Sequence, residues 1–397
     1  MSNLKCQISN VKLSIGYLTI IIALFFYSFT QVDLGLTLAR WPIWQTAQQF
    51  FQSIGYFNRP LSAVLYLIII TLLFLFYFLF LKNAEKIGNK TIWILIILTS
   101  VILTFSYNAF SYDLFNYIFD AKIVTFYNQN PYFHKALDYP GDPMLLFMHW
   151  THRTFPYGPL WLFLTVPISF AGSQVFLFTL FLFKGLATAA FLGTTYFVGK
   201  ILKNISPKNE LFGVVLFALN PLVIIESLVS SHNDIVMIFF AIFALYLLLV
   251  KKNLLSLIVL LLAGAIKFAT FLLVPVFLYV IYLSKKGKNV FWNKIFLVSS
   301  VILFAAVIMA SIRTNFQPWY FLYLLPFLTL LGKKYYAVIP VFTVSLFGLL
   351  QYVPFLYLGN WDPPVPQILN WLNIFSAIIP AVLLFIYFKF AKSRKSI

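Results

Sequence analysis

The residues of this chain best suited to chemistry lie in one hydrophilic segment, 109–156, between long apolar runs. Asp113, Asn116, Tyr117 and Asp120 occupy positions i, i+3, i+4 and i+7, so in a helix they share one face. Apolar residues on either side would let such a helix lie at a membrane surface and present two carboxylates, an amide and a phenol to a polar partner. A solvated face of an interfacial helix, without a function, is the alternative interpretation.

A second group of polar residues lies within and after a later apolar run. Asn220-Pro221 interrupts this run, because proline cannot donate a backbone hydrogen bond. Glu226 follows inside the run, where an acid is costly and therefore a functional candidate. It could instead bond to backbone groups that the proline frees. His232 and Asp234 come at the end of the run, where they could join the hydrophilic segment.

Further polar and aromatic residues lie at other ends of apolar runs. Lys267, between two runs, could hold a lipid phosphate or extend its head group to the membrane interface. Gln317, Trp319 and Tyr320 precede another run, and the two aromatics could stack on a substrate or belong to the interfacial aromatic belt. Lys184, inside a run, is interpreted as a polar contact within the helix bundle.

Several other chemistries lack their sequence signatures. His149 and His152, at i and i+3, could ligate zinc in a helix, but no third ligand has a fixed spacing, so we expect no metal. The chain has no Gly-x-Ser-x-Gly elbow and no glycine-rich phosphate loop, which disfavours a Ser/His/Asp hydrolase and a nucleotide site. The single cysteine, Cys6, excludes an internal disulfide framework. We therefore expect no cofactor.

The elements that must position these residues are membrane helices. The 397 residues are 62% hydrophobic and 10% charged, with a mean hydropathy of +0.92. Soluble domains are about 45–50% apolar and about 25% charged. Long apolar runs separated by short basic loops favour helices over a barrel. The prediction is an all-α polytopic protein with a single transmembrane domain over 1–397, in which 109–156 is an extracytoplasmic catalytic loop with interfacial helices.

Twelve runs could each cross the membrane once. They lie at about 13–31, 61–81, 92–108, 174–199, 211–230, 235–250, 254–266, 268–283, 295–312, 318–332, 335–357 and 367–388. A further run at 157–171 is too short to span comfortably, and counting it would place the basic segment 200–210 outside. We therefore expect it to be re-entrant or to lie along the surface.

The net charge of +18 is explained by topology. With the N-terminus in the cytoplasm, the inner segments hold 20 of the 28 Lys and Arg residues, the positive-inside pattern. The basic residues then anchor the chain on the anionic inner leaflet, and no nucleic-acid partner is needed to explain them. Seven of the ten acids fall on the outer side. We therefore expect an integral, multi-pass plasma-membrane protein whose active site faces outside.

Several motifs, in order over roughly residues 100–330, resemble those of a known superfamily. Segments 112–121, 130–132 and 157–160 resemble the first outer loop of GT-C glycosyltransferases, closest to those that use polyprenyl-phosphate-mannose. These include bacterial alpha-mannosyltransferases and the mannosyltransferases of glycosylphosphatidylinositol assembly. Segments 220–234 and 317–326 resemble further blocks of the superfamily. The resemblance implies a GT-C-like bundle of about 12 helices in which this first outer loop is large and catalytic.

The resemblance also implies a reaction. A sugar, with mannose as the expected one, passes from a polyprenyl-phosphate donor to a lipid- or glycan-linked acceptor, and Asp113 is the catalytic base. Because a lipid phosphate leaves readily, such a reaction needs a base more than an acid. Lys267 and Arg153 are candidate cations for the phosphate, and Asp120, His232 and Asp234 are candidates for orienting sugar hydroxyls. The full set of expected donor- and acceptor-binding residues is Asn116, Tyr117, Asp120, Arg153, Tyr157, Glu226, His232, Asp234, Lys267, Gln317, Trp319 and Tyr320.

Three other kinds of protein are alternatives to such a mannosyltransferase. A polytopic transporter or lipid-carrier flippase is compatible with twelve spans and a broken helix, but no internal two-fold repeat is visible and most acids lie outside the midplane. An oligosaccharyl transferase would bring a large outer domain, and a lipid-phosphate phosphatase would show an array of arginine and histidine residues. A one-sided cavity reaching Asp113 would favour the enzyme.

Overall fold

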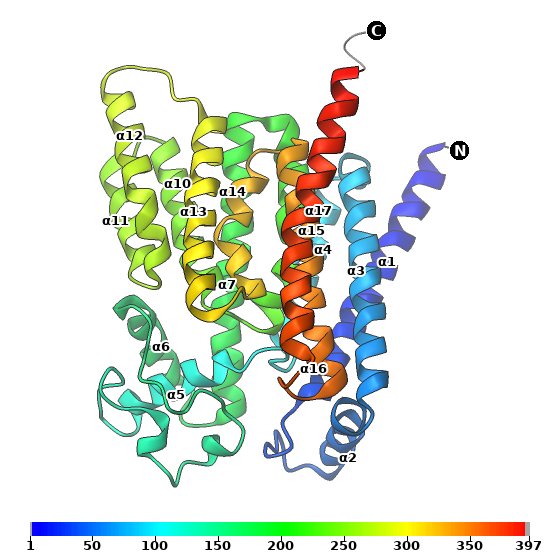
Figure 1. The fold of residues 1–397 in the computed structure, drawn as a ribbon, viewed down its shortest axis with the longest axis vertical. Helices are drawn as coiled ribbons and strands as arrows, with labels where there is room; N and C mark the ends of the chain where they lie inside the picture. Colours follow the sequence, from blue (N-terminus) through cyan, green and yellow to red (C-terminus); the bar gives the residue numbers. More distant parts are fainter. Residues whose placement is uncertain (1, 394–397) are drawn as a thin grey trace.

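The chain is an elongated helical bundle. A computed structural model describes residues 2–393, which form seventeen α-helices with shorter 3-10 and π segments and no β-strand. In Figure 1 the long helices run side by side along the vertical axis, while α2 (Pro42–Gln52), α5 (Asp113–Thr125) and α6 (Pro159–Ala171) gather at the lower end. The predicted all-α polytopic fold is confirmed.

Seven helices in the described part of the chain are long and apolar enough to cross a membrane. They are α1 (Ser2–Ser28), α3 (Arg59–Ile87), α7 (Phe176–Ile205), α12 (Val274–Lys285) with the 3-10 segment before it (Phe268–Leu273), α13 (Trp292–Thr314), α15 (Tyr335–Leu350) with α16 (Tyr352–Leu358), and α17 (Val365–Ser393). Four shorter apolar helices accompany them: α4 (Asn89–Thr104), α6, α10 (Asp234–Leu249) and α11 (Asn253–Gly264).

A bent helix pair gives an eighth candidate crossing if it is counted as one broken span, and its break lies where Asn220-Pro221 predicted an interruption. Helix α8 (Glu210–Ala218) ends just before this pair, and α9 (Pro221–Ile224) continues into a π segment (Ile225–Val229) after a bend of 55°. The Asn220 side chain accepts the backbone N–H of Leu222 at 2.9 Å, which caps the new helix start. Every residue from 212 to 238 is buried, so this broken span lies at the centre of the molecule.

The predicted run 318–332 is not a single helix. It forms a 3-10 segment (Pro318–Tyr323) followed by the short helix α14 (Leu325–Thr329). Pro318 and Pro326 stand at the start of these two pieces, where a missing N–H is tolerated, and each prevents a continuous α-helix through the run. The irregular backbone is buried inside the bundle, where non-helical segments at membrane depth are tolerated.

The hydrophilic segment after α4 folds into a compact unit with α6. Helix α5 packs against α6 and α7, and eight of its thirteen residues are buried. Lys122 forms an ion pair with Asp142, which also accepts the hydroxyl of Tyr127 at 2.7 Å. Helix α5 is therefore covered on most sides, and the prediction that one polar face is presented to a partner is wrong for most of its length. Only the first residue, Asp113, opens to a cavity.

Candidate active site

A large cavity lies where the hydrophilic unit meets the bundle. Its volume is about 2200 Å³. The walls come from segments 107–113 and 149–158, the 3-10 segment before α12, the end of α13 with the residues after it, and α16 with the start of α17. Since these segments adjoin α5 and α6, the cavity belongs to the lower end of the bundle in Figure 1, opposite the start of α1 and the end of α17.

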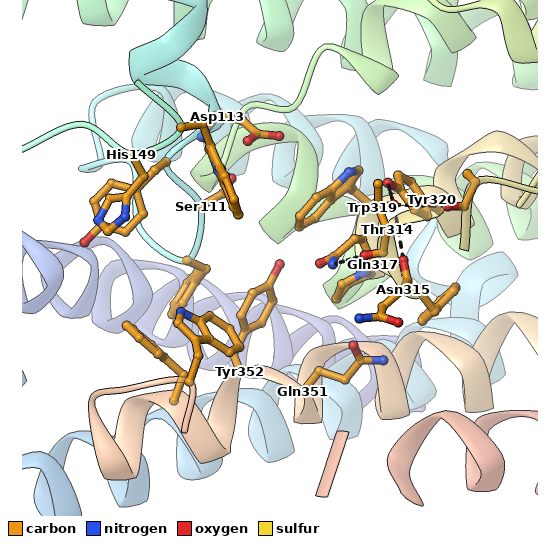
Figure 2. A pocket seen from close by; sticks show the side chains of 18 of the residues that line it. Ser111, Asp113, His149, Thr314, Asn315, Gln317, Trp319, Tyr320, Gln351 and Tyr352 are labelled. Carbon is orange, nitrogen blue, oxygen red and sulfur yellow. Dashed lines mark hydrogen bonds between the residues drawn. The ribbon is translucent and has the colours of Figure 1, made fainter. Parts of the chain in front are cut away.

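Asp113 stands at the first turn of α5 with its backbone N–H donated to the hydroxyl of Ser111 at 3.2 Å. Its carboxylate is 19% exposed, and that exposed part faces the cavity. Figure 2 shows Asp113 and Ser111 on one side of the cavity and Gln317, Trp319 and Tyr320 across from them. A carboxylate at a helix start is favoured by the helix dipole, which stabilises its charged form.

His232 lies directly behind Asp113 and is fully buried. Its Nδ1 is 3.5 Å from Asp113 Oδ2, and its Nε2 is 3.3 Å from Glu226 Oε2. The imidazole stacks on Trp319 with ring centroids 4.1 Å apart. Tyr352 donates its hydroxyl to Glu226 Oε1 at 2.8 Å, so the row runs from Asp113 through His232 and Glu226 to Tyr352, and both of its ends line the cavity.

The charges of this row set the protonation states near the cavity. Burial opposes a charged imidazole, but the carboxylates of Asp113 and Glu226 outweigh it and raise the pKa of His232 to about 9. Burial alone would raise the pKa of Asp113, yet His232, Lys267 and Arg153 outweigh it and lower that pKa below its ordinary value. At neutral pH the site therefore holds an ionised Asp113 beside an imidazolium.

Five lysine and arginine side chains line the cavity: Arg59, Lys135, Arg153, Lys267 and Arg313. Lys267 is paired with the buried Asp234, whose two carboxylate oxygens both lie 2.8 Å from Lys267 Nζ. Arg153 lies on the ring of Trp150, 4.2 Å from its centroid, and Arg313 lines the cavity from the end of α13. Within residues 2–393 neither Arg153 nor Arg313 has a carboxylate at ion-pair distance, so their charge is open to an anionic ligand.

The structure sorts the expected site residues into three sets. Those that line the cavity are Asp113, Arg153, Tyr157, Lys267, Gln317, Trp319 and Tyr320. Those buried directly behind the lining are Glu226, His232 and Asp234. Those that lie away from the cavity are Asn116, Tyr117 and Asp120. The structure thus brings together residues separated by more than two hundred positions in the sequence.

The three residues away from the cavity are used inside the hydrophilic unit. Asn116 donates to the backbone oxygen of Tyr112 one turn earlier, at 3.2 Å. Tyr117 packs edge-on against Tyr157 and Trp161, each with ring centroids 5.2 Å apart. Burial raises the pKa of Asp120 well above its ordinary value, which favours a neutral carboxyl inside the unit. Periodicity placed these side chains on one face, but the packing of α6 and α7 covers that face.

Gln351 and Tyr352 line the cavity but were not predicted as site residues from the sequence. Gln351 lies between α15 and α16, Tyr352 begins α16, and both fall inside the predicted run 335–357. Gln351 donates its amide to Asn373 Oδ1 of α17 at 2.8 Å, which joins the last two spans at the cavity wall. A glutamine in an apolar run was the available signal, since buried amides in membrane helices need partners.

The histidines of the hydrophilic unit also reach the cavity. His149 and His152 both line it, and the His149 ring packs against Tyr112 with centroids 3.8 Å apart. Burial lowers the pKa of His149 below its ordinary value, so this imidazole is neutral at neutral pH. In the described part of the chain, no group of three or more His, Cys, Asp and Glu side chains could hold a metal ion.

The fold and the cavity define a polytopic helical membrane protein with an acidic, cation-flanked site at one end of its bundle. Residues 19–283 match the family described as alpha-(1->6)-mannopyranosyltransferase, N-terminal domain, and the chain belongs to this family. It is therefore a glycosyltransferase, a membrane mannosyltransferase, which confirms the family resemblance seen in the sequence. No curated protein and no solved structure matches the chain.

The family match ends at residue 283, and several residues that line the cavity come later in the chain. It includes Asp113, Glu226 and His232, but the stacking ring of Trp319 and the hydroxyl of Tyr352 come from beyond residue 283. The last third of the chain therefore supplies the wall opposite Asp113 and both aromatic groups that contact the buried row.

Proposed function

We propose that this mannosyltransferase takes its mannosyl group from a polyprenyl-phosphate carrier and transfers it, with inversion, to a hydroxyl of a lipid- or glycan-linked acceptor on the outer face of the plasma membrane. The observation that carries the proposal is the side chain of Asp113, which opens to a cavity of about 2200 Å³ and whose lowered pKa favours the charged carboxylate. That volume exceeds the usual range of about 300–1,000 Å³ for small-ligand pockets and suits two large substrates.

Asp113 acts as the general base. The acceptor hydroxyl gives its proton to the Asp113 carboxylate while its oxygen attacks the anomeric carbon of the donor. The bond between that carbon and the phosphate oxygen breaks, and the electron pair leaves with the polyprenyl phosphate. Holding both substrates in one cavity makes the step effectively unimolecular, which is a large part of the expected acceleration.

The imidazolium of His232 orients the base. With Nδ1 3.5 Å from Oδ2, the cation favours one carboxylate rotamer and directs the other oxygen toward the cavity. Glu226, 3.3 Å from the other ring nitrogen, balances the buried positive charge. His232 therefore acts through Asp113 and does not contact sugar hydroxyls, since it lies behind the cavity wall.

The leaving phosphate needs fixed cations, and Arg153 and Arg313 are best placed to supply them. Both line the cavity, and both have guanidinium groups that match a phosphate bidentately. The charge of Lys267 is already balanced by Asp234, so we assign it to holding the wall beside Tyr157, whose ring centroid is 5.5 Å from Lys267 Nζ.

The carrier chain has an apolar path out of the cavity. Leu272, before α12, and Ala306 and Met309, on α13, all line the cavity. Leu272 and Met309 also belong to the exposed apolar surface of the spans, which faces acyl chains in a membrane. A polyprenyl chain could therefore lie between these two spans while its phosphate remains near Arg313.

The charge distribution supports an outward-facing site. The turn between α3 and α4 and the loop between α12 and α13 lie at the end of the bundle opposite α5 and α6 in Figure 1. Lys286 and Lys288 lie in these connections, and the adjoining helix ends carry Lys82, Lys86, Lys90, Lys285 and Lys294. Basic connections favour the cytoplasmic side, so the cavity end would face outside.

The test is a donor panel offered to the purified protein in lipid nanodiscs. Polyprenyl-phosphate mannose, polyprenyl-phosphate glucose and a nucleotide-linked mannose are each supplied with a mannoside acceptor, and released carrier is measured. We expect polyprenyl phosphate to be released with the mannose donor and a new mannosyl linkage of inverted configuration. Release from the nucleotide donor alone, or retention of configuration, would contradict the proposal.

A further inference from the structure

Lys184 is a fully buried amine that the proposed reaction does not use. It lies within α7, and its Nζ is hydrogen-bonded to the backbone oxygens of Leu228 at 2.7 Å and Val229 at 2.8 Å and to Ser106 Oγ at 3.2 Å. Ser106 in turn donates its own proton to the backbone oxygen of Leu103 at 2.7 Å. Three oxygens thus lie within hydrogen-bond distance of one nitrogen, and they come from two separate backbone segments.

Burial of a lysine amine without a carboxylate partner is costly, so its position calls for an explanation. No carboxylate lies within ion-pair distance of Lys184 in the part of the chain that the structure describes. Burying an unpaired charge is expensive, and a hydroxyl or amide could satisfy one or two carbonyls at lower cost. The partners are the last carbonyls of the broken span, where the helix dipole places partial negative charge. The amine of Lys184 therefore satisfies backbone acceptors at a helix end that have no partner within the helix.

The two segments that Lys184 joins lead directly to Asp113 and His232, the first two members of the buried row. The chain runs from Ser106 through a non-helical stretch to Asp113, and from Val229 it reaches His232 three residues later. A second link supports the first, because Ser230 donates its hydroxyl to the backbone oxygen of Ala109 at 2.8 Å.

We propose that Lys184 is a positioning residue for the pair of Asp113 and His232. It sets their separation through the two backbone segments that it ties together. The inference rests on the proposed role of Asp113 as base. The contact between the pair is 3.5 Å, and displacement by about 1 Å can cost on the order of 10²-fold in rate.

The test compares Lys184→Met with Thr194→Val. Methionine nearly keeps the volume of the side chain but removes its hydrogen bonds. Thr194→Val removes a buried hydroxyl from the same helix, one that donates to the backbone oxygen of Ala190 at 2.8 Å. We expect Lys184→Met to lower kcat on the order of 10²-fold with a nearly unchanged KM for the donor. Thr194→Val should leave both constants near wild type.

The pH dependence of kcat/KM distinguishes a role of Lys184 in positioning Asp113 and His232 from a role in overall stability alone. Titratable groups that face Asp113 are His232, Lys267, Arg153, Tyr117, Tyr157, Tyr320 and Tyr352. Of these, His232 does most to keep the pKa of Asp113 low. If Lys184→Met separates the pair, the acid limb of kcat/KM should move to higher pH. A variant that only folded less well would lose active protein without moving that limb.

A second readout does not depend on turnover. Hydrogen–deuterium exchange should increase in segments 106–112 and 228–234 of Lys184→Met, with no increase in the second half of α7. Ser230→Ala should produce the same pattern more weakly, and it carries the test if Lys184→Met does not fold. Unchanged kcat, acid limb and exchange in the folded variants would overturn the inference. Absence of transfer by the wild-type protein would instead refute the proposed function, and exchange alone would then decide the role of Lys184.

Discussion

At the scale of single residues, the imidazole of His232 lies between two carboxylates, 3.5 Å from Asp113 and 3.3 Å from Glu226. The two carboxylates raise the pKa of His232, while His232, Lys267 and Arg153 lower the pKa of Asp113. With such cationic partners a carboxylate can stay ionised although it is buried. The row therefore links the strength of the base to the protonation of His232.

Raising the pH through about 9 should destabilise the protein. The pKa of His232 is raised from 6.5 to about 9 in the folded state, so its contribution to stability is complete below about 6.5 and lost as the pH rises through about 9. We expect the melting temperature to fall across this window. His232→Gln should flatten this part of the pH dependence, whereas the exposed His134→Gln should not. Differential scanning fluorimetry measures both, and equal slopes in wild type and His232→Gln would refute a protonated His232.

At the scale of elements, the broken span brings the buried row to the cavity end of the bundle. Asn220 stabilises the break from two sides, because its oxygen caps the N–H of Leu222 at 2.9 Å and its amide donates to Ser345 at 2.9 Å. Beyond it, the π segment ends at Val229, and the turn that follows carries His232. The position of His232 thus depends on an interruption that begins twelve residues earlier.

Removal of the Asn220 side chain should therefore weaken the whole element. Loss of a helix cap costs about 0.5–2 kcal/mol, and the hydroxyl of Ser345 loses a partner as well. We expect Asn220→Ala to lower the free energy of unfolding by about 2 kcal/mol. Asn204→Ala, which removes an exposed amide from α7, is the matched control. Unfolding in a denaturing detergent would show the difference, and equal stability of the two variants would contradict this role of Asn220.

The same element shows what could be predicted from the sequence. Asn220-Pro221 predicted the break because proline removes a backbone donor, and the acid inside the run predicted a site at Glu226. The contact of His232 with Trp319 could not be predicted, because it joins residues 87 positions apart and depends on how the 3-10 segment packs. Helix α5 was predicted, but its buried faces were not, since periodicity does not show which neighbours cover a helix.

At the scale of the whole molecule, the two ends of the bundle differ in charge, and only one of them is next to the cavity described above. Basic connections gather at the end that holds the start of α1, and the cavity lies at the other end with α5 and α6. The positions of the lysines along the sequence predicted this asymmetry, because the short segments between apolar runs on the inner side are rich in lysine. The closure of the cavity by residues beyond 283 could not be predicted, because it requires the path of the last spans around the bundle.

The orientation in the membrane can be read with single cysteines. The chain contains one cysteine, so Cys6→Ser gives a cysteine-free background. We expect Asp138→Cys in the hydrophilic unit to react with an impermeant thiol reagent on intact cells, and Lys208→Cys to react only after the membrane is opened. Mass-shift labelling measures both sites. The reverse pattern would place the cavity on the cytoplasmic side and contradict the proposed outward-facing site.

The central claim is that Asp113 is the base of mannosyl transfer, and the most direct test is the single-turnover rate of Asp113→Asn in nanodiscs loaded with polyprenyl-phosphate mannose and acceptor. Asparagine keeps the shape of the side chain but cannot accept the proton, so we predict a loss on the order of 10²–10⁴-fold. Donor binding should persist, and Asp138→Asn, an exposed acid in the same unit, should transfer at the wild-type rate. Transfer by Asp113→Asn at the rate of Asp138→Asn would contradict the account.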